Sequence, residues 1–574
     1  MMTLTLRDLQ EVFLTFETVK AKKGKVVYNN KNLDCGLSDL EMISKYNYVT
    51  IDTAHQSDDF LDKKLFFAER YGGDGISTNG GGGRCGFDGV FQLKGLGPNQ
   101  LVGDRPRDTY GNSHANGFLS LDVAIYEYIW AEIINVALPY GAVKSVAVID
   151  LELDFEEPDQ KLRRGLLVRL PAVRPAHFIR ALYFKEEKKG LLSEDARRVK
   201  ETMHKLVYFL PKPADNIKTD TLEEKLCAGI IELAMRYAEQ FSAAKAKRIY
   251  HQSISASNIT LTGGWMDLAG STVFSEKVLW NGFDIKYFTL EYEPAISSIQ
   301  DMCFYLSKYN IISGNVSFSI FESAKEAFKT RYDKSLPKYE LAQAGFPLDV
   351  LEKIASDALF VEASKVVNKI LAYDDFSLSE VLCDDWSGYE YGVCNLYKKL
   401  LMEYAYLNKD STDWASGEAQ KKDSISCAYN YLVNIALNIA APLGVTRKSL
   451  VKLMAINIVR LNRCDASIID LKDKIKNIRQ SDKGDETRLL YSELYEDVNC
   501  SAYMTYQHGS NFSTLFWKDV SSEIYYNAIK DDFVVYGKGM SSPVYGTISE
   551  LEEDFLSLKK AVFFYKDIME FLHE

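Results

Sequence analysis

The chain has 574 residues, of which 47% are hydrophobic and 26% are charged, which is typical of a globular protein with a substantial core. Its formal net charge of −12 argues against broad binding to nucleic acid or to an anionic membrane, because both need a basic surface. Nine cysteines occur without a CxxC pair, the N-terminus lacks a secretory pattern, and no apolar run reaches about 18 residues. We therefore expect a cytoplasmic protein with reduced thiols, without a zinc site, a membrane span or a nucleic-acid partner.

The first half of the chain mixes strand and helix patterns. A run of glycines at 80–83 is too flexible for the interior of an element and predicts a loop. Residues 90–94 alternate as a strand, 119–138 repeat apolar residues at helical spacing, and two strand patterns follow at 146–151 and 165–170. This succession of strand, helix, strand and strand predicts an α+β fold.

Helical patterns occupy 192–210 and 222–249, residues 250–275 have the pattern of short β segments and turns, and helices dominate from about 296 onward. We divide the chain into three parts on these grounds. They are an N-terminal extension (1–60), a nucleotide-binding core (61–345) and a large helical C-terminal region (346–574).

Two features of the core have the chemistry of a phosphate site. Glycines let backbone N–H groups approach phosphate oxygens closely, which makes Gly82, Gly83 and the adjoining Arg84 candidates, although most glycine-rich loops are plain turns and no Walker A sequence follows. Lys94 lies on the next predicted strand and Glu127 on the helix after it. Kinases fix their phosphate-binding lysine with such a strand–helix ion pair. A solvated lysine and a surface glutamate are an equal alternative.

A third feature is the pair Asn258 and Asp267, on either side of a Gly-Gly turn that predicts a β-hairpin. Amide and carboxylate oxygens suit Mg²⁺, and the order copies the catalytic-loop asparagine and the DFG aspartate of kinases. Alone, such a pair is more often two turn residues. Arg169 and Arg174, near a strand end, have the fork geometry that binds phosphate oxygens, with a solvated strand edge as the equal alternative.

Taken together, these motifs resemble the selenoprotein O family in order and spacing. Residues 92–97 (QLKGLG) resemble its element LKGxG, and residues 251–267 match HGxMNTDN…DYGP at His251, Asn258 and Asp267. Weaker matches are 71–73 and 82–84 to the upstream glycine segments, 126–132 to RExxxSEA, 168–178 to MRVAxSxxRFGxF, and 332–346 to a later helical segment. The resemblance spans roughly residues 60–350.

The resemblance implies a protein-kinase-like bilobal core that binds ATP and Mg²⁺ and transfers AMP, because the family binds ATP in a flipped orientation. It assigns phosphate contact to Lys94, orientation of that lysine to Glu127, and Mg²⁺ to Asn258 and Asp267. It assigns further phosphate contacts to Arg169 and Arg174. All of these side chains must then converge around one triphosphate.

One departure from the family pattern bears on the acceptor. The family's catalytic base is the aspartate just before the metal-binding asparagine, and here that position is Ser257. A hydroxyl acceptor needs a base, whereas a carboxylate is already ionised near neutral pH. We therefore hypothesise adenylation of a carboxylate on a protein or peptide, which primes it for ester or amide formation.

Divergent relatives of that family are expected to include maturation proteins of bacterial peptide-toxin clusters, as for siderophore-microcins, where a peptide C-terminal carboxylate is joined to a glycosylated siderophore. The C-terminal region, with a large tyrosine load, is expected to bind the acceptor or a partner protein. Two alternatives stay open. One is a catalytically silent, ATP-binding pseudokinase scaffold, which Ser257 favours. The other is a protein kinase that transfers the γ-phosphate, which the missing base disfavours.

Overall fold

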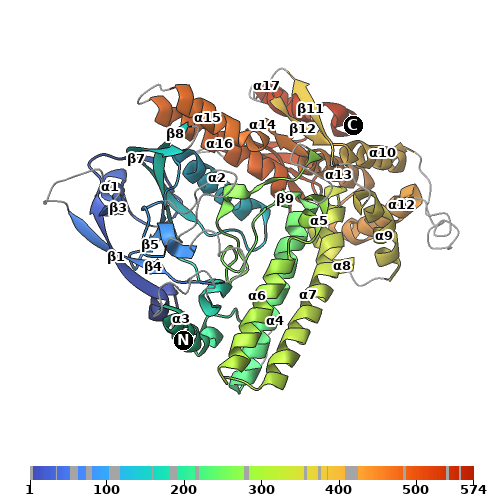
Figure 1. The fold of residues 1–574 in the computed structure, drawn as a ribbon. Coiled ribbons are helices and arrows are strands. Elements are labelled where there is room, and N and C mark those ends of the chain that lie inside the picture. The colour runs from blue at the N-terminus through green and yellow to red at the C-terminus, as the bar shows by residue number, and fades with distance from the viewer. Residues whose placement is uncertain are drawn as a thin grey trace.

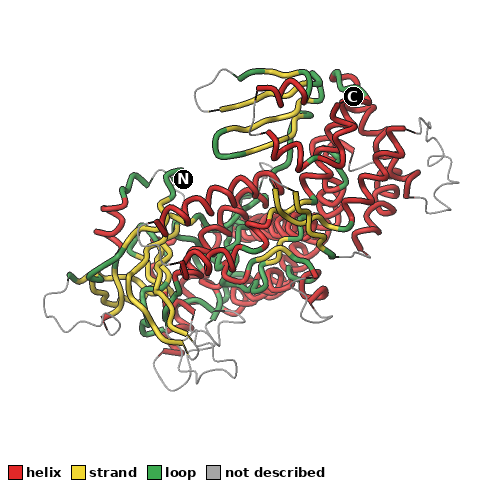
Figure 2. The backbone as a smooth tube through the Cα atoms, turned by 90° about the horizontal axis from the view of Figure 1, so that it is seen from above, coloured by secondary structure: helices red, strands yellow, loops and turns green. Residues whose placement is uncertain are grey.

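The computed structural model describes residues 4–33, 35–51, 62–72, 81–101, 117–157, 160–180, 191–213, 219–276, 284–354, 358–372, 376–383, 386–406, 425–481, 486–537, 542–554 and 558–573. Within them the chain has the mixed α+β fold that the sequence predicts, with one large sheet at one end and helices beside and beyond it (Figures 1 and 2). Among these residues, no helix is long and apolar enough to cross a membrane.

The large sheet has eight strands in antiparallel pairing. In spatial order they are β2 (Lys25–Asn29), β7 (Ser145–Glu157), β8 (Gln160–Arg169), β6 (Gln92–Lys94), β5 (Cys85–Phe87), β4 (Lys63–Glu69), β1 (Phe13–Lys20) and β3 (Tyr48–Thr50). The expected N-terminal extension, 1–60, thus supplies three strands of the core sheet and is not a separate part. In β1, Phe16 and Thr18 are buried while Thr15 and Glu17 are exposed, as in a strand with one solvated face.

Helix α2 (Leu121–Ala137) packs against β7 and β8 on one side and against α15 (Leu471–Ser481) and α16 (Glu486–Tyr506) on the other (Figure 1). Its sequence is apolar on nearly every face, which suits a helix that is covered on both sides. Ser120 caps its first turn by accepting a hydrogen bond from the backbone N–H of Val123. The ring of Tyr128 stacks on the ring of Tyr28 of β2, with 4.8 Å between ring centres, and lies 5.7 Å from the ring centre of Tyr495 of α16.

The middle of the chain is a helical layer beyond the sheet (Figure 1). Its long helices, α4 and α7, pack along one another, and α6 packs against both. The elements are α3 (Leu191–Met203), α4 (Leu222–Ala246), β9 (Ile249–Tyr250), β10 (Thr272–Val273), α5 (Asp284–Thr289), α6 (Glu293–Lys308) and α7 (Gly314–Gln343). β9 and β10 form a short antiparallel pair, as the mixed pattern of 250–275 predicts, and they frame the loop that carries Asn258 and Asp267.

The C-terminal region is helical but also contains two antiparallel sheets, so the expectation of a helical region is correct only in part. Its helices are α8 (Leu348–Ile354), α9 (Ala358–Ala372), α10 (Val393–Tyr406), α12 (Ile425–Ala440), α13 (Arg447–Leu461), α14 (Ala466–Ile469), α15, α16, α17 (Ile548–Asp554), α18 (Lys559–Phe564) and α19 (Met569–His573). The sheets are β11 (Leu378–Cys383), β12 (Trp386–Tyr391) and β13 (Arg463–Asp465), and β14 (Ser513–Lys518), β15 (Ser522–Asn527), β16 (Asp532–Gly537) and β17 (Val544–Tyr545). These strands are short, and a few alternating residues are hard to tell from one face of a helix.

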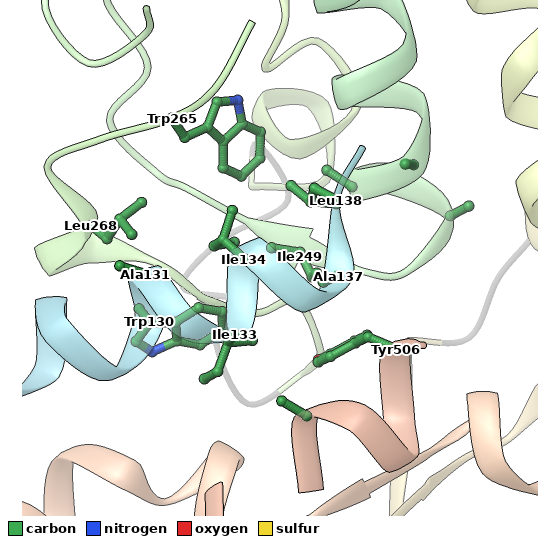
Figure 3. Packing of buried hydrophobic residues seen from close by; sticks show 14 of the residues in the cluster. Trp130, Ala131, Ile133, Ile134, Ala137, Leu138, Ile249, Trp265, Leu268 and Tyr506 are labelled. Carbon is green, nitrogen blue, oxygen red and sulfur yellow. The ribbon is translucent and has the colours of Figure 1, made fainter. Parts of the chain in front are cut away.

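A buried lysine joins the C-terminal region to the core. Figure 3 shows the last turns of α2, at Ile133 and Ala137, between Trp265 on one side and Tyr506 at the end of α16 on the other. Lys247, just after α4, donates to the carbonyl oxygens of Ala137 at 2.6 Å and Tyr506 at 2.9 Å. One ammonium therefore ties together the C-terminal ends of α2, α4 and α16, where helix carbonyls lack partners.

Lys247 is 7% exposed, and burial, helped by the nearby charge of Arg460, lowers the pKa of its ammonium to about 7. Between pH 7 and about 10 the unfolded chain therefore binds the proton more strongly than the folded protein. We expect this one group to make unfolding less favourable as pH rises, by ~1.4 kcal/mol per pH unit across that window. Denaturant titrations at several pH values measure this slope.

The Lys247→Met variant should lack this contribution, so the difference in unfolding free energy between wild type and variant should change steadily from pH 7 to 10. Lys329→Met, at an exposed position of α7, is the matched control and should run parallel to wild type. Parallel curves for Lys247→Met would contradict the assignment.

Candidate nucleotide site

Lys94, at the end of β6, is the centre of the site. It is 1% exposed, and its ammonium donates to Oε1 of Glu127 at 2.6 Å and to Oδ1 of Asp267 at 2.5 Å. Gly95 follows with φ +102°, and a Cβ there would lie 2.6 Å from the carbonyl oxygen of Gly165, so only glycine lets the chain turn away at this point. A cation this deeply buried needs such compensation, because its desolvation is costly.

Asp267 meets two cations through one oxygen. Oδ1 also accepts from Nη1 of Arg169 at 3.2 Å, and no hydrogen bond to Oδ2 is found among the described residues. Burial raises the pKa of this carboxyl, but Lys94, Arg169 and Arg84 outweigh it and hold the pKa well below the usual range. The backbone at Asp267 is left-handed, φ 63° and ψ 58°, a conformation that aspartate tolerates better than most residues. An ionised carboxylate is therefore held beside Lys94 with one oxygen available.

Asn258 lies at the neighbouring end of the same hairpin. The backbone N–H of Met266 donates to the carbonyl of Asn258 at 2.9 Å, and an antiparallel bridge joins Ile259 to Trp265, as the Gly-Gly turn predicts. The Asn258 amide donates to the carbonyl of Ser253 at 2.7 Å, and its Oδ1 accepts from the hydroxyl of Ser257 at 3.1 Å. The hairpin thus places Asn258 opposite Met266, which precedes Asp267.

Buried polar contacts hold this loop in place. The ring of His251 is buried and its Nε2 donates to the carbonyl of Met266 at 2.9 Å, next to Asp267. Burial lowers the pKa of His251 to about 4, so the ring is neutral near pH 7. Glu291, between α5 and α6, accepts from the backbone N–H groups of His251 and Gln252 at 3.0 and 2.8 Å. His251 therefore positions the hairpin.

The oxygen donors fit Mg²⁺ better than a metal that needs a dedicated protein cage. Within the described ranges, no group of three or more His, Cys, Asp or Glu side chains could hold a metal ion. Mg²⁺ usually takes one or two protein oxygens and completes its shell with water and phosphate. Asn258 Oδ1 and Asp267 Oδ2 would be those two oxygens.

The glycine turn packs against the end of β4. Residues Gly81–Arg84 form a 3₁₀ turn, which differs from the expected open loop, and Gly80 lies outside the described residues. A Cβ at Gly82 would lie 2.2 Å from the carbonyl oxygen of Glu69, so glycine is required for this approach. Asn99 pins the turn by donating from its amide to the Gly82 carbonyl and from its backbone N–H to the Gly83 carbonyl. Arg84 donates to the carbonyl of Phe118, and its positive charge helps to lower the pKa of Asp267.

Arg169, at the end of β8, has an unpaired donor beside the site. Its side chain is 3% exposed, Nε donates to Oε1 of Gln92, and Nη1 donates to Asp267. Nη2 is buried without a hydrogen-bond partner among the described residues. Such a group is costly to leave unsatisfied, and a phosphate oxygen would satisfy it.

Arg174, the second arginine that the resemblance assigns to the phosphates, pairs with Glu69 rather than with Asp267. It is 0% exposed, its Nη2 pairs with Oε2 of Glu69 at 2.9 Å, and its Nη1 donates to the carbonyl of Ser257 at 3.1 Å. Its guanidinium also lies 4.3 Å from the centre of the Tyr71 ring. Arg174 thus joins β4 to the hairpin loop through two of its donors, while its Nε is buried without a hydrogen-bond partner among the described residues.

The segment after Asp267 is fastened from two directions. The hydroxyl of Tyr126, on α2, donates to the carbonyl of Ser271. From the C-terminal region, the carbonyl of Phe376 accepts from the backbone N–H of Glu276 at 3.0 Å, and the hydroxyl of Tyr391 donates to the carbonyl of Phe274 at 3.0 Å. Residues far apart in the chain therefore hold the segment that follows Asp267.

The structure joins Lys94, Glu127, Arg169 and Asp267 in one set of contacts, and it places Asn258 across the hairpin from Met266, the residue before Asp267. Sequence reasoning missed Glu69, and it gave Gln92 no role of its own. Gln92 could have been found, because residues two apart on a strand share a face and Gln92 precedes Lys94 by two. Glu69 gives no such signal, since it sits among ordinary charges in the segment KKLFFAER.

Comparison with models of protein families and with curated proteins gives no match for this chain. The function of the site must therefore be argued from its geometry and from the motif resemblance.

The Glu127→Gln variant tests the central ion pair. It replaces a charge-assisted hydrogen bond to Lys94 with a neutral one, and we expect the free energy of unfolding to fall by about 1.5–3 kcal/mol. Thermal and denaturant unfolding at pH 7 measure the loss. Glu132→Gln, on the same helix, is the matched control: burial raises the pKa of Glu132, so removing its charge should cost little or nothing. Equal losses in both variants would contradict a special role for Glu127.

Proposed function

We propose that this chain is an ATP- and Mg²⁺-dependent nucleotidyltransferase with a kinase-like nucleotide site, which transfers AMP to a carboxylate on a protein or peptide. The observation that carries the proposal is the buried Lys94 ammonium between Glu127 and Asp267, with the unpaired Nη2 of Arg169 beside it. A lysine and an arginine that both contact Asp267, on a hairpin that also carries Asn258, suit a triphosphate with its metal ion.

The arrangement of elements supports a kinase-like site. β4, β5 and β6 are adjacent antiparallel strands, the glycine turn lies between the first two, and Lys94 ends the third. The glutamate partner comes from the next helix, and the asparagine and aspartate come from a later hairpin. Protein kinases place a glycine loop, a strand lysine, a helix glutamate and a metal-binding Asn and Asp in the same succession.

Each side chain then has a defined task. Lys94 and Arg169 bind and orient the phosphates, and Glu127 keeps the lysine ammonium directed into the site. Asp267 and Asn258 would hold Mg²⁺, which when bound offsets charge on the phosphates. The acceptor carboxylate attacks the α-phosphorus, the bond to the β-phosphate oxygen breaks, and pyrophosphate leaves with its electron pair.

Ser257 points to the carboxylate acceptor. Its hydroxyl contacts Ser255 Oγ at 2.8 Å and Asn258 Oδ1 at 3.1 Å, and residues 252–257 contain no carboxylate. His251 is buried and neutral, and its Nε2 is committed to Met266, so it is a poor replacement base. A carboxylate acceptor loses no proton as it attacks, so positioning and electrostatic stabilisation suffice. A peptide C-terminus, as in the siderophore-microcin type of maturation, is the acceptor we favour.

Isotope labelling distinguishes the three functions. We expect purified protein with Mg²⁺ to transfer the label of [α-³²P]ATP, with release of pyrophosphate, to peptides with a free C-terminus but not to amidated ones. Added hydroxylamine should trap the product as a hydroxamate. Label from [γ-³²P]ATP on the peptide would instead identify a kinase, and ATP binding without turnover would identify a scaffold.

In this assay Lys94→Met should lower the rate by about 10²–10³-fold, because a donor to the reacting phosphates is lost. Lys161→Met, at an exposed position of β8, is the control and should leave the rate unchanged. A rate unaffected by Lys94→Met would overturn the assigned site.

The Ser257→Asp variant tests the acceptor class. With a carboxylate acceptor we expect no gain in rate, because there is no proton to remove. With a hydroxyl acceptor a restored base should raise the rate, typically by 10²-fold or more. The comparison uses the same peptide with a free C-terminus and with an added serine hydroxyl at an amidated C-terminus.

A further inference from the structure

Glu69 is the most enclosed carboxylate near the site, and nothing above gives it a task. It is 0% exposed at the end of β4. Its Oε2 accepts from Nη2 of Arg174 at 2.9 Å and faces Nε2 of His177 at 3.0 Å, and its Oε1 accepts from the amide of Gln92. Burial raises the pKa of this carboxyl, but Arg174, His177 and Gln92 outweigh it and lower the pKa to about 2. The group is therefore ionised and fully hydrogen-bonded.

The contacts of Glu69 lead to the phosphate site by two routes. Through Gln92, whose Oε1 accepts from Nε of Arg169, the carboxylate fixes the guanidinium that carries the unpaired Nη2. Through Arg174, which donates to the carbonyl of Ser257, it reaches the residue just before Asn258. Its own carbonyl oxygen also lies against Gly82.

We propose that Glu69 is a positioning residue for phosphate binding: by holding the amide of Gln92 in one orientation, it fixes the guanidinium of Arg169 so that Nη2 faces the phosphates. The inference rests on the proposed nucleotide site and adds to it a relay from Glu69 through Gln92 to Arg169. Glu69 contacts Arg174, His177 and Gln92, and in this role it does not need to touch the nucleotide.

Hydrogen-bond direction makes the relay sensitive to one atom. Nδ1 of His177 accepts from the backbone N–H of Arg174 at 3.2 Å, so the ring proton is on Nε2 and points to Glu69. Glu69 therefore faces two donors on one side and the Gln92 amide N–H on the other. A carboxylate accepts on both sides, whereas an amide can accept on only one.

The Glu69→Gln variant should break the relay for this reason. The new amide must direct its oxygen to Arg174 and His177, which places its NH₂ against the NH₂ of Gln92. If Gln92 flips to relieve this, its NH₂ faces Nε of Arg169, and the guanidinium loses its acceptor. The double variant Glu69→Gln, Gln92→Glu restores every donor–acceptor pair at unchanged total charge.

The test measures dissociation constants for Mg·ATP and for adenosine with the full-length protein, well below the unfolding temperature. We expect Glu69→Gln to weaken Mg·ATP by about tenfold or more, the value of one charge-assisted hydrogen bond, and to leave adenosine nearly unchanged. The double variant should recover Mg·ATP binding to within a few fold of wild type. Gln92→Met removes only the relay and keeps the Glu69–Arg174 pair, so it should also weaken Mg·ATP binding. It serves as the test if Glu69→Gln does not fold.

Glu390→Gln is the matched control. Glu390 is also buried and paired, with Arg463 and Lys398, but it lies on β12 in the C-terminal region. The Glu390→Gln variant should lower the unfolding temperature without changing the ratio of the affinities for Mg·ATP and adenosine. A merely structural role for Glu69 would lower both affinities together.

The outcomes separate the two proposals. A wild-type protein that binds neither Mg·ATP nor inorganic triphosphate overturns the nucleotide site and this inference with it. Wild-type binding with an unchanged affinity ratio in Glu69→Gln and Gln92→Met, or a double variant no better than Glu69→Gln, overturns the relay and leaves the nucleotide site intact.

Discussion

The arrangement of the core depends on one buried ammonium. Lys94 can lie 1% exposed only because two carboxylates meet it, and those carboxylates come from α2 and from the hairpin after β9. Neither partner can move away without leaving an uncompensated charge in a low-dielectric interior. The ion pairs thus join the sheet, the helix and the hairpin at one point. The same point is where two cationic side chains and two oxygen ligands suit a nucleotide.

Several buried polar side chains surround this centre. Glu69, Gln92, Arg169 and Arg174 form a continuous set of hydrogen bonds from the glycine turn to the hairpin. Such a network is useful only when nearly all of its members are satisfied, because a half-satisfied one is worse than an apolar core. Two donors of this set, Nη2 of Arg169 and Nε of Arg174, lack partners among the described residues, and the one on Arg169 belongs to the guanidinium that pairs with Asp267.

The central residues could be predicted from the sequence because they follow one another in the order of a known set of motifs. Lys94, Glu127 and Asp267 lie on a strand, a helix and a hairpin that periodicity and glycine placement reveal, so their meeting could be expected. Arg174 has the same residue type as Arg169 and a similar place near the strand end, and nothing local tells that Arg169 pairs with Asp267 and Arg174 with Glu69. The pairing of Arg174 depends on Glu69, which is distant in sequence and carries no pattern of its own.

The limits of the fold prediction have a related cause. Long elements such as α2 and α4 repeat apolar residues over several turns, and their bounds were predicted to within a few residues. β1 and β2 pair with strands that come later in the chain, β4 and β7, and β14 to β17 are short strands that pair with their sequence neighbours. Short strands of that kind become recognisable only when their partners are known, which single-sequence periodicity does not provide.

Three sets of contacts join the C-terminal region to the core. They are the hydrogen bonds of Lys247, the packing of α15 and α16 against α2, and the hydrogen bonds of Phe376 and Tyr391. We therefore expect the junction between the core and the region after residue 345 to act as a permanent interface rather than as a hinge between modules. Were the two portions produced as separate polypeptides, each would expose an apolar face that water disfavours, and they would have to co-assemble to be soluble. Insertions and fusions are therefore better tolerated at the tip of the α6–α7 hairpin than near that junction.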